Sequence, residues 1–189
     1  MLIGKHKYNK KYLNSFGVGD NMFKSKDFMF MNVVSVDGKK IGFIKDLLID
    51  FNKGKVIGFL ISPYNFFQKN LSVLTEDIIF FNKDMVVKKV VKSTQLYLHS
   101  FISMDVIDIY RNILGMVEDI TFTGNDFVIK GVIVSSGFIT NLLRGKRIFL
   151  INQLILGEEN ILYIPNHDKY CFKSMPHNFF IQEKSDEKK

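Results

Sequence analysis

One stretch of the chain occurs twice, and this repeat constrains the fold more than any other feature of the sequence. The second copy follows the first at a constant separation of 73 residues. A repeated sequence of this length predicts a repeated structural unit. We therefore expect an N-terminal extension, a first unit, a linker, a second unit and a C-terminal extension, at residues 1–25, 26–91, 92–98, 99–164 and 165–189. The repeated positions include Gly42 with Gly115, Asp46 with Asp119, and Gly58 with Gly131.

The size of each unit indicates that the two pack against each other. A unit of about 65–75 residues buries only about 60% of the surface that its unfolded chain exposes, so it is marginal alone. With 47% hydrophobic residues, the chain can build a packed core. No apolar run approaches the ~18 residues of a membrane span, and residues 1–11 lack the apolar region of a signal peptide. The single cysteine, Cys171, excludes an internal disulfide, and we expect a cytoplasmic protein.

The net charge of +7 is unevenly distributed. It is +4 over residues 1–27 and +4 over residues 28–92, but −2 over residues 93–164 and +1 over residues 165–189. The positive charge thus belongs to the N-terminal extension and the first unit. Such an excess either keeps the protein soluble or attracts an anionic partner such as RNA, and the sequence leaves both readings open.

The spacing of apolar residues predicts a bend in one strand of each unit. After the tight-turn pair Asp37-Gly38, apolar residues fall at spacings of three, two and two from Ile44 to Phe51. A flat strand keeps a spacing of two, so the slip at Lys45-Asp46 predicts a β-bulge. The second unit repeats the slip at Glu118-Asp119. Two copies of one bend are typical of the corners of a small barrel.

The strand after this bend is apolar on both faces in each copy. Residues 55–62 surround Gly58, and residues 127–135 surround Gly131. A strand of this kind lies inside a fold, and a central glycine marks a bend or the close approach of another backbone. Together with the other short strands and tight turns, these strands predict an all-β protein of two tandem small β-barrels, each of five to six strands.

These patterns resemble the PRC-barrel domain family. The residues that carry the resemblance are the run 36–50 and the run 55–61 that follows it. Gly38 stands one place earlier than the usual glycine of the family. The second copy fits more loosely, because Asn112 and Thr123 depart from the common pattern. The likeness covers both predicted units.

The resemblance implies a compact six-stranded barrel in each unit and a role in binding other macromolecules. PRC barrels are named for the cytoplasmic domain of the photosynthetic reaction-centre H subunit. They also occur in ribosome small-subunit maturation factors and in small bacterial proteins, some of them tied to sporulation. The whole chain is most similar to tandem-barrel proteins of clostridia-type bacteria. Because the family motif is structural, the resemblance implies no catalytic residue.

The repeated acids Asp46 and Asp119 are the most conspicuous polar residues within the units. Because each falls at a predicted bulge, we interpret them, like the repeated glycines, as structural: their carboxylates accept backbone N–H groups that the bulge frees. A catalytic pair would require both to face one cleft, and nothing in the sequence suggests this. The spacing of His167, Cys171 and His177 fits no common zinc site. Without a nucleotide-binding or nucleophile motif, the chain is predicted to be no enzyme and to bind no cofactor or metal.

The loop after the central strand is apolar in both units, although loops are normally polar. Such loops either fold back over the barrel or between the units, or they form an exposed apolar surface with a basic rim, which is a docking surface for a partner. The candidate docking residues in loops 63–69 and 136–147 are Phe66, Phe67, Phe138, Ile139, Leu142, Leu143, Arg144, Lys146 and Arg147.

We therefore predict a non-enzymatic, adaptor-type protein that docks a protein partner through these loops. The alternative is an RNA- or ribosome-associated protein that uses the basic N-terminal segment and the first unit. Peripheral membrane contact through loop 136–147 is a third, weaker hypothesis. No small-molecule substrate is indicated, and the sequence specifies neither the partner's identity nor the oligomeric state.

Overall fold

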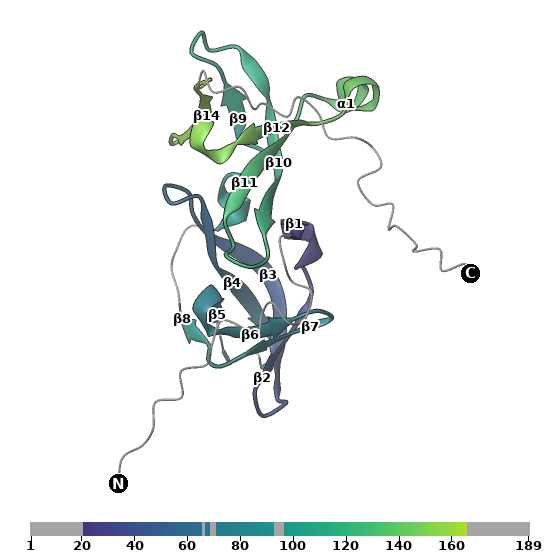
Figure 1. Ribbon diagram of the computed structural model, residues 1–189, viewed down its shortest axis with the longest axis vertical. Coiled ribbons are helices and arrows are strands. Elements are labelled where there is room, and N and C mark those ends of the chain that lie inside the picture. Colours follow the sequence, from purple (N-terminus) through teal and green to yellow (C-terminus); the bar gives the residue numbers. More distant parts are fainter. Residues whose placement is uncertain (1–20, 66, 69–70, 93–96, 166–189) are drawn as a thin grey trace, which may run out of the picture.

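Two curved sheets follow each other along the long axis of the protein (Figure 1). In this computed structural model the described residues are 21–65, 67–68, 71–92 and 97–165. The first sheet has the strand order β6-β7-β2-β3-β4-β5-β8. The second has the order β12-β11-β10-β9-β14-β13, with β1 added to β10. The predicted all-β fold of two similar units is confirmed, but each sheet has seven strands where five to six were predicted, because short strands such as β1 and β8 are added to it.

Each unit is built from short strands joined by tight turns. The first sheet consists of β2 (Asn32–Ser35), β3 (Lys40–Asp50), β4 (Lys55–Pro63), β5 (Leu71–Leu74), β6 (Ile78–Phe81), β7 (Asp84–Val87) and β8 (Val91–Lys92). The second consists of β1 (Met22–Lys24), β9 (Asp105–Ile107), β10 (Ile113–Thr123), β11 (Ile129–Ser135), β12 (Arg147–Leu150), β13 (Leu154–Leu156) and β14 (Asn160–Tyr163). The helical pieces are the 3-10 turns η3 (Ser25–Asp27), η4 (Thr75–Asp77), η5 (Leu98–Ser100) and η6 (Ile151–Gln153), and the α-helix α1 (Phe138–Arg144).

The predicted bulge is present in both long strands. The pairing of β3 with β4 shifts register between Ile44 and Asp46, and the pairing of β10 with β11 shifts register between Val117 and Asp119. The shift lets apolar residues on both sides of it face the interior, which explains the spacing of three in the sequence. Each long strand also shifts register a second time nearer its end, and the apolar spacing did not predict this second shift.

The two units meet at a junction that repeats itself under the 73-residue offset. The N–H of Val56 donates to the carbonyl of Phe127 over 2.9 Å, and the N–H of Ile129 donates to the carbonyl of Gly54 over 2.8 Å. Each donor is the repeat equivalent of the other, and so is each acceptor. The contact is therefore the same from both sides, as in the isologous interface of a two-fold dimer. Lys55 forms a bridge with its own equivalent and marks the centre of the junction.

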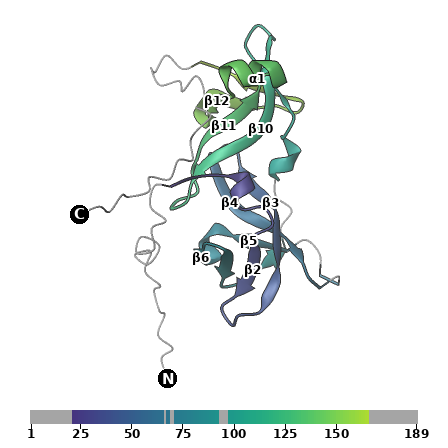
Figure 2. The same ribbon diagram turned by 90° about the vertical axis from the view of Figure 1, so that its right-hand side faces the viewer.

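Each unit also receives the leading segment of the other. The strand β1, which precedes the first unit, pairs with β10 of the second unit and places Lys24 opposite Thr121. In the same way Tyr97, which precedes the second unit, forms a bridge with Leu48 in β3. These two pairs are equivalent under the repeat. The units are thus joined by an exchange of segments, visible for β1 in Figure 2.

One hydrophobic core runs through the junction. Phe28 is 1% exposed, and its ring centroid lies 5.0 Å from that of Phe59 and 5.4 Å from that of Phe122 in the second unit. Phe127, also of the second unit, lies 6.0 Å from Phe59. Aromatic rings at these separations attract one another beyond their apolar burial. The predicted packing of the two units against each other is confirmed, and their interiors form a single cluster.

Two segments differ from the prediction. Residues 22–24, predicted as part of a separate extension, form β1, because their backbone groups pair with β10 of the distant unit. The stretch 136–147, predicted as a loop, contains α1. A glycine with positive φ stands at each end of this helix, and the pattern of apolar residues gave no sign of these two helix boundaries. Residues 1–20 and 166–189, and with them Cys171 and both of its neighbouring histidines, lie outside the described residues.

Candidate docking surface

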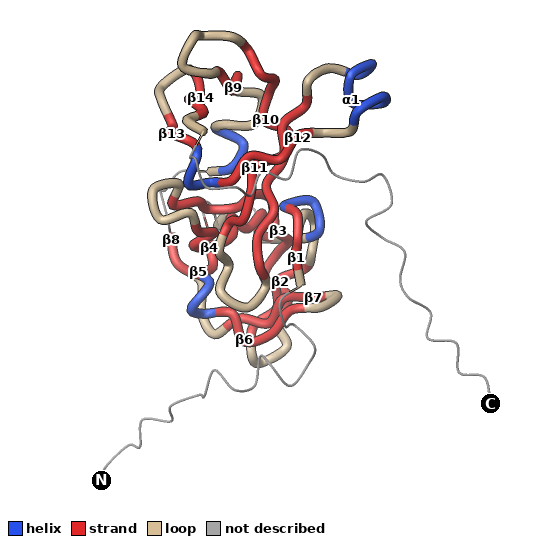
Figure 3. Tube along the Cα trace, turned by 45° about the horizontal axis from the view of Figure 1, so that its top comes forward, coloured by secondary structure: helices blue, strands red, loops and turns tan. Residues whose placement is uncertain are grey.

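The helix α1 carries its apolar side chains on the outside. They are 83%, 71%, 64% and 77% exposed, at Phe138, Ile139, Leu142 and Leu143 respectively. Figures 1 and 3 show α1 standing away from the second sheet. An ordinary surface helix turns its apolar stripe toward the core and its polar side toward water. The orientation of α1 is the reverse, so these four side chains form an exposed apolar face.

Hydrogen bonds attach α1 and the residue pair before it to strands β10 and β11. The side chain of Asn141 accepts the N–H of Ser136 over 3.0 Å and donates to the hydroxyl of Ser135 over 2.6 Å. The hydroxyl of Ser136 donates to the carbonyl of Leu114 over 3.1 Å. At the other end, the N–H of Gly145 donates to the carbonyl of Asn141 over 2.9 Å. Because these bonds position the helix, its apolar face is not required for attachment to the unit.

Three basic residues follow the apolar face, and the protein engages two of them. Lys146 forms a hydrogen-bonded ion pair with Glu118, and Arg147 donates to a backbone carbonyl of β10 over 3.4 Å. Burial raises the pKa of Glu118, but the hydrogen bond and charge of Lys146, with the charge of Lys26, outweigh it and lower that pKa. Arg144 is exposed and has no such partner among the described residues.

The other predicted docking loop, 63–69, lies on a different surface. Phe67 is 97% exposed, whereas Tyr64 donates its hydroxyl to Asn32 over 2.8 Å, and Phe66 lies outside the described residues. The strands β4 and β11 begin together at the junction and run from it in opposite directions. Each covers roughly 25 Å, so the loops at their far ends are well separated. The two predicted loops therefore form two surfaces, and only α1 gathers several exposed apolar side chains.

The repeated acids are buried at the bulges and connect the two units. Asp46 and Asp119 each accept the N–H of the next residue, over 2.7 Å and 2.8 Å. Asp119 also accepts the N–H of Ser25 over 3.2 Å and the hydroxyl of Ser25. Asp46 contacts the Nδ1 of His99. Since Ser25 lies in η3 and His99 in η5, each acid fastens the leading turn of the opposite unit.

The sequence identified these acids but not their partners across the junction. The turns η3 and η5 begin at Ser25 and Leu98, which are equivalent under the repeat. The sequence contains this equivalence, because the 73-residue offset of the repeat also places Ser25 on Leu98. It shows that the turns correspond, but it carries no information on which acid each turn meets, because that choice depends on the arrangement of the units.

We expect Asp119→Ala to lower the free energy of unfolding by about 1–3 kcal/mol, because it leaves buried N–H groups without an acceptor. Asp108→Ala is the matched control. Asp108 also accepts three hydrogen bonds, two from Asn112 and one from Tyr110, but in an exposed turn where water replaces it. Urea unfolding of both variants measures the difference. Equal losses of stability would show that burial at the junction adds nothing to the role of Asp119.

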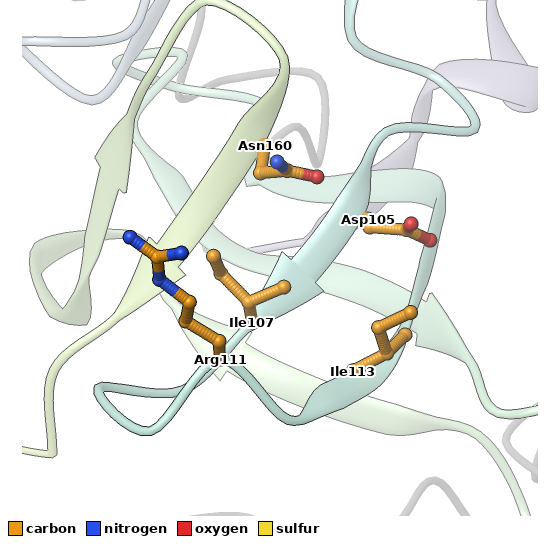
Figure 4. Close-up of a pocket in the computed structure, with 5 residues that line it drawn as sticks. All are labelled: Asp105, Ile107, Arg111, Ile113 and Asn160. Atoms are coloured by element: carbon orange, nitrogen blue, oxygen red, sulfur yellow. The ribbon is translucent and has the colours of Figure 1, made fainter.

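A hollow of about 440 Å³ opens beside β9 and β14 in the second unit. Figure 4 shows Arg111 and Asp105 on opposite sides of it. The first unit has the hydrogen-bonded pair Asn32–Asp84, 2.9 Å apart, at the positions that match Asp105 and Asn160. The lining of the hollow in the second unit contains one carboxylate and neither a nucleophile nor an imidazole, so the hollow has no convergent catalytic set. The lining residues are Asp105, Ile107, Arg111, Ile113 and Asn160.

Clusters of metal ligands, and helices long and apolar enough to span a membrane, are both absent from the described part of the chain. No three histidine, cysteine or acidic side chains come together there in a way that could hold a metal ion. None of its helices has the length and hydropathy needed to cross a membrane.

Two curved sheets on one repeated plan, joined by exchanged segments, define a small tandem-barrel protein. The family model of the PRC-barrel domain matches the chain twice, at residues 20–92 and 93–162. The chain belongs to the PRC-barrel domain family, and the resemblance read from the sequence is confirmed. Domains of this family are non-catalytic modules that mediate contacts between proteins. A comparison with curated proteins finds no match.

Proposed function

We propose that this protein is a non-enzymatic adaptor that docks a protein partner on the α1 surface. We define the α1 surface as the apolar side chains of Phe138, Ile139, Leu142 and Leu143, with Arg144 at their rim. The observation that carries the proposal is the reversed orientation of the helix, whose apolar side faces water. Complete burial of one such side chain is worth about 1.5–3 kcal/mol, so a partner that covers several of them gains substantial affinity.

The chemistry of the α1 surface favours a protein over RNA or a membrane as the ligand of this surface. Protein interfaces combine an apolar centre with a polar or charged rim, and arginine is enriched in them. RNA binding would instead require several free cations along a phosphate backbone, and the protein already engages Lys146 and Arg147. Membrane binding by an interfacial helix uses many basic residues on its polar side, where α1 has Thr140 and Asn141.

Replacing the four apolar residues of the α1 surface with serine is expected to reduce capture of the partner from the protein's own cell lysate at least tenfold. Loss of the apolar area removes the main attraction. The matched control replaces Ile109, Tyr110 and Ile113 with serine, since these residues are also exposed and apolar in the second unit, at 58%, 79% and 66%. Captured proteins are quantified by mass spectrometry, and thermal unfolding verifies that both variants are folded.

Three outcomes would contradict the proposal. Equal losses in the α1 variant and its control would show that any exposed apolar residue supports capture. Capture that is abolished by nuclease and by replacing Lys5, Lys7, Lys10 and Lys11 with glutamine would establish the RNA alternative instead. Co-sedimentation with phosphatidylglycerol vesicles, lost in the α1 variant, would assign the α1 surface to a membrane.

A further inference from the structure

The hollow beside β9 and β14 gathers polar and aliphatic side chains on the outer face of the second sheet. Within β9 the side chain of Val106 is buried, so those of Asp105 and Ile107 on either side of it point outward. Asn160 in β14 pairs with Asp105, and Ile113 in β10 pairs with Ile107. At about 440 Å³, the hollow has the size of a site for a small ligand.

Arg111 adds a positive charge from a turn that holds it in an unfavourable backbone conformation. Its φ of 66° lies in the left-handed region, which is costly for a residue with a side chain. The repeat equivalent of Arg111 is Gly38, with a φ of 79°, and glycine adopts this conformation without the cost. Asp108 stiffens the turn by accepting the N–H groups of Tyr110 and Asn112 over 2.8 Å and 2.9 Å. Because costly conformations cluster at functional sites, an arginine in place of glycine indicates a role for its side chain.

The first unit uses its own side chains at the matching place. The residues that match Asp105 and Asn160 are Asn32 and Asp84, which hydrogen-bond to each other over 2.9 Å, and Gly38 supplies no cation. Within the described part of the chain, the polar side chains around the hollow of the second unit have no such partner. The repeat also supplies no strand to cover the hollow, because in the first unit the segment after β7 pairs, as β8, with β5 at the other end of the sheet.

We propose that this hollow binds a dipeptide with aliphatic side chains, independently of the partner that docks on the α1 surface. Asp105 would repel a plain anion and Arg111 a plain cation, so the pair favours a ligand that carries both charges. Figure 4 shows Ile107 between the two charged side chains, so the charges of the ligand must be separated by a bridging group. The free ends of an extended dipeptide stand roughly 7 Å apart, whereas those of a single amino acid are joined through one carbon.

Each group around the hollow suits one part of a dipeptide. The guanidinium of Arg111 donates to the terminal carboxylate, for which its planar fork of N–H groups has the matching geometry. The carboxylate of Asp105 accepts the terminal ammonium. The side-chain amide of Asn160 has both a donor and an acceptor, as the central peptide group does. Ile107 and Ile113 bury part of an aliphatic side chain of the ligand.

The test uses the full-length protein and two variants that carry the residues of the first unit, Arg111→Gly and Asp105→Asn. The probe is leucyl-leucine, compared with its C-terminal amide and its N-acetyl derivative, and binding is followed by NMR at the backbone amides of β9 and β14. Blocking either end is expected to weaken binding to the unchanged protein roughly fivefold. In Arg111→Gly the C-terminal amide should bind as well as the free dipeptide, while the N-acetyl derivative still binds more weakly. In Asp105→Asn the two derivatives exchange these roles, and thermal unfolding verifies that both variants are folded.

Four outcomes would overturn the inference. Unchanged amide signals at β9 and β14 would mean that the hollow binds no dipeptide. Equal affinities for the free and the two blocked dipeptides would reduce the contact to apolar burial. Free leucine that binds as tightly as leucyl-leucine would refute the separation of the two charges. If Arg111→Gly shifts the signals of residues 166–189 in the absence of any peptide, the chain's own C-terminal segment occupies the hollow.

Discussion

Phe28→Ala is expected to lower the free energy of unfolding by about 3–5 kcal/mol, the range measured for large aromatic residues truncated in protein cores. Phe28 is buried, and its ring contacts rings of both units: Phe59 at 5.0 Å in the first and Phe122 at 5.4 Å in the second. The deletion leaves a cavity at the junction, where neither unit can relax alone to fill it. We expect the two units to lose stability together.

The control for this prediction is Phe30→Ala. Phe30 lies two residues away, is 77% exposed and has, among the described residues, one ring neighbour, Phe43 at 6.0 Å. Its truncation is expected to change stability by less than about 0.5 kcal/mol, as for other surface substitutions. Guanidinium unfolding, followed by tyrosine fluorescence and by NMR signals from each unit, measures both effects. A Phe28→Ala protein in which only the first unit melts early would contradict a shared core.

Gly42→Ala is the second substitution with a large expected effect, at the upper end of the ~1–3 kcal/mol or more that overpacking costs. A β-carbon on Gly42 would lie 2.1 Å from the carbonyl oxygen of Ser62 and 2.7 Å from the Cα of Pro63. Both obstacles are backbone atoms of the paired strand β4, so they cannot move aside without breaking the sheet. At the equivalent position of the second unit, a β-carbon on Gly115 would lie 2.4 Å from the carbonyl oxygen of Ser135.

The control is Gly38→Ala, in the turn between β2 and β3. A β-carbon there has no neighbour within 4 Å, but the φ of +79° belongs to the left-handed region. Only the conformational penalty of about 1–2 kcal/mol remains. Chemical denaturation of both variants separates steric overlap from backbone strain. If Gly38→Ala proves as destabilising as Gly42→Ala, close approach of the strands is not the reason why the repeat has glycine at position 42.

Local patterns in the sequence were sufficient to predict the β-bulges and a close strand contact, because these features depend on the geometry of a single strand. The break in apolar spacing at Asp46 and Asp119 predicted the bulges, because residues on either side of a bulge must return to the same face. The central glycine of the strand that is apolar on both faces predicted a bend or a close backbone contact. Gly58 shows a close contact, because a β-carbon there would lie 2.4 Å from the carbonyl of Val73. Each prediction needed only the alternation of side chains along one strand.

The candidate site was predicted only in part. The apolar residues of stretch 136–147 were recognised as unusual for a loop, but their helical conformation was not. Helix α1 is seven residues long, and its ends are determined by Gly137, Asn141 and Gly145. So short a segment has no lasting helical period, and its stability derives from hydrogen bonds to Ser135 and Leu114 that only the folded unit provides.

The sequence alone thus determined the duplication, the all-β character of both units and the positions of bends and tight contacts, since these follow from periodicity within single strands. The tertiary structure decided how the two copies combine. It exchanged β1 and the turns η3 and η5 between the units, merged their interiors around Phe28, and left the apolar side of α1 facing water. The exchange and the shared interior depend on pairings between residues about 50–100 positions apart, and the pattern of any one segment is compatible with several such pairings.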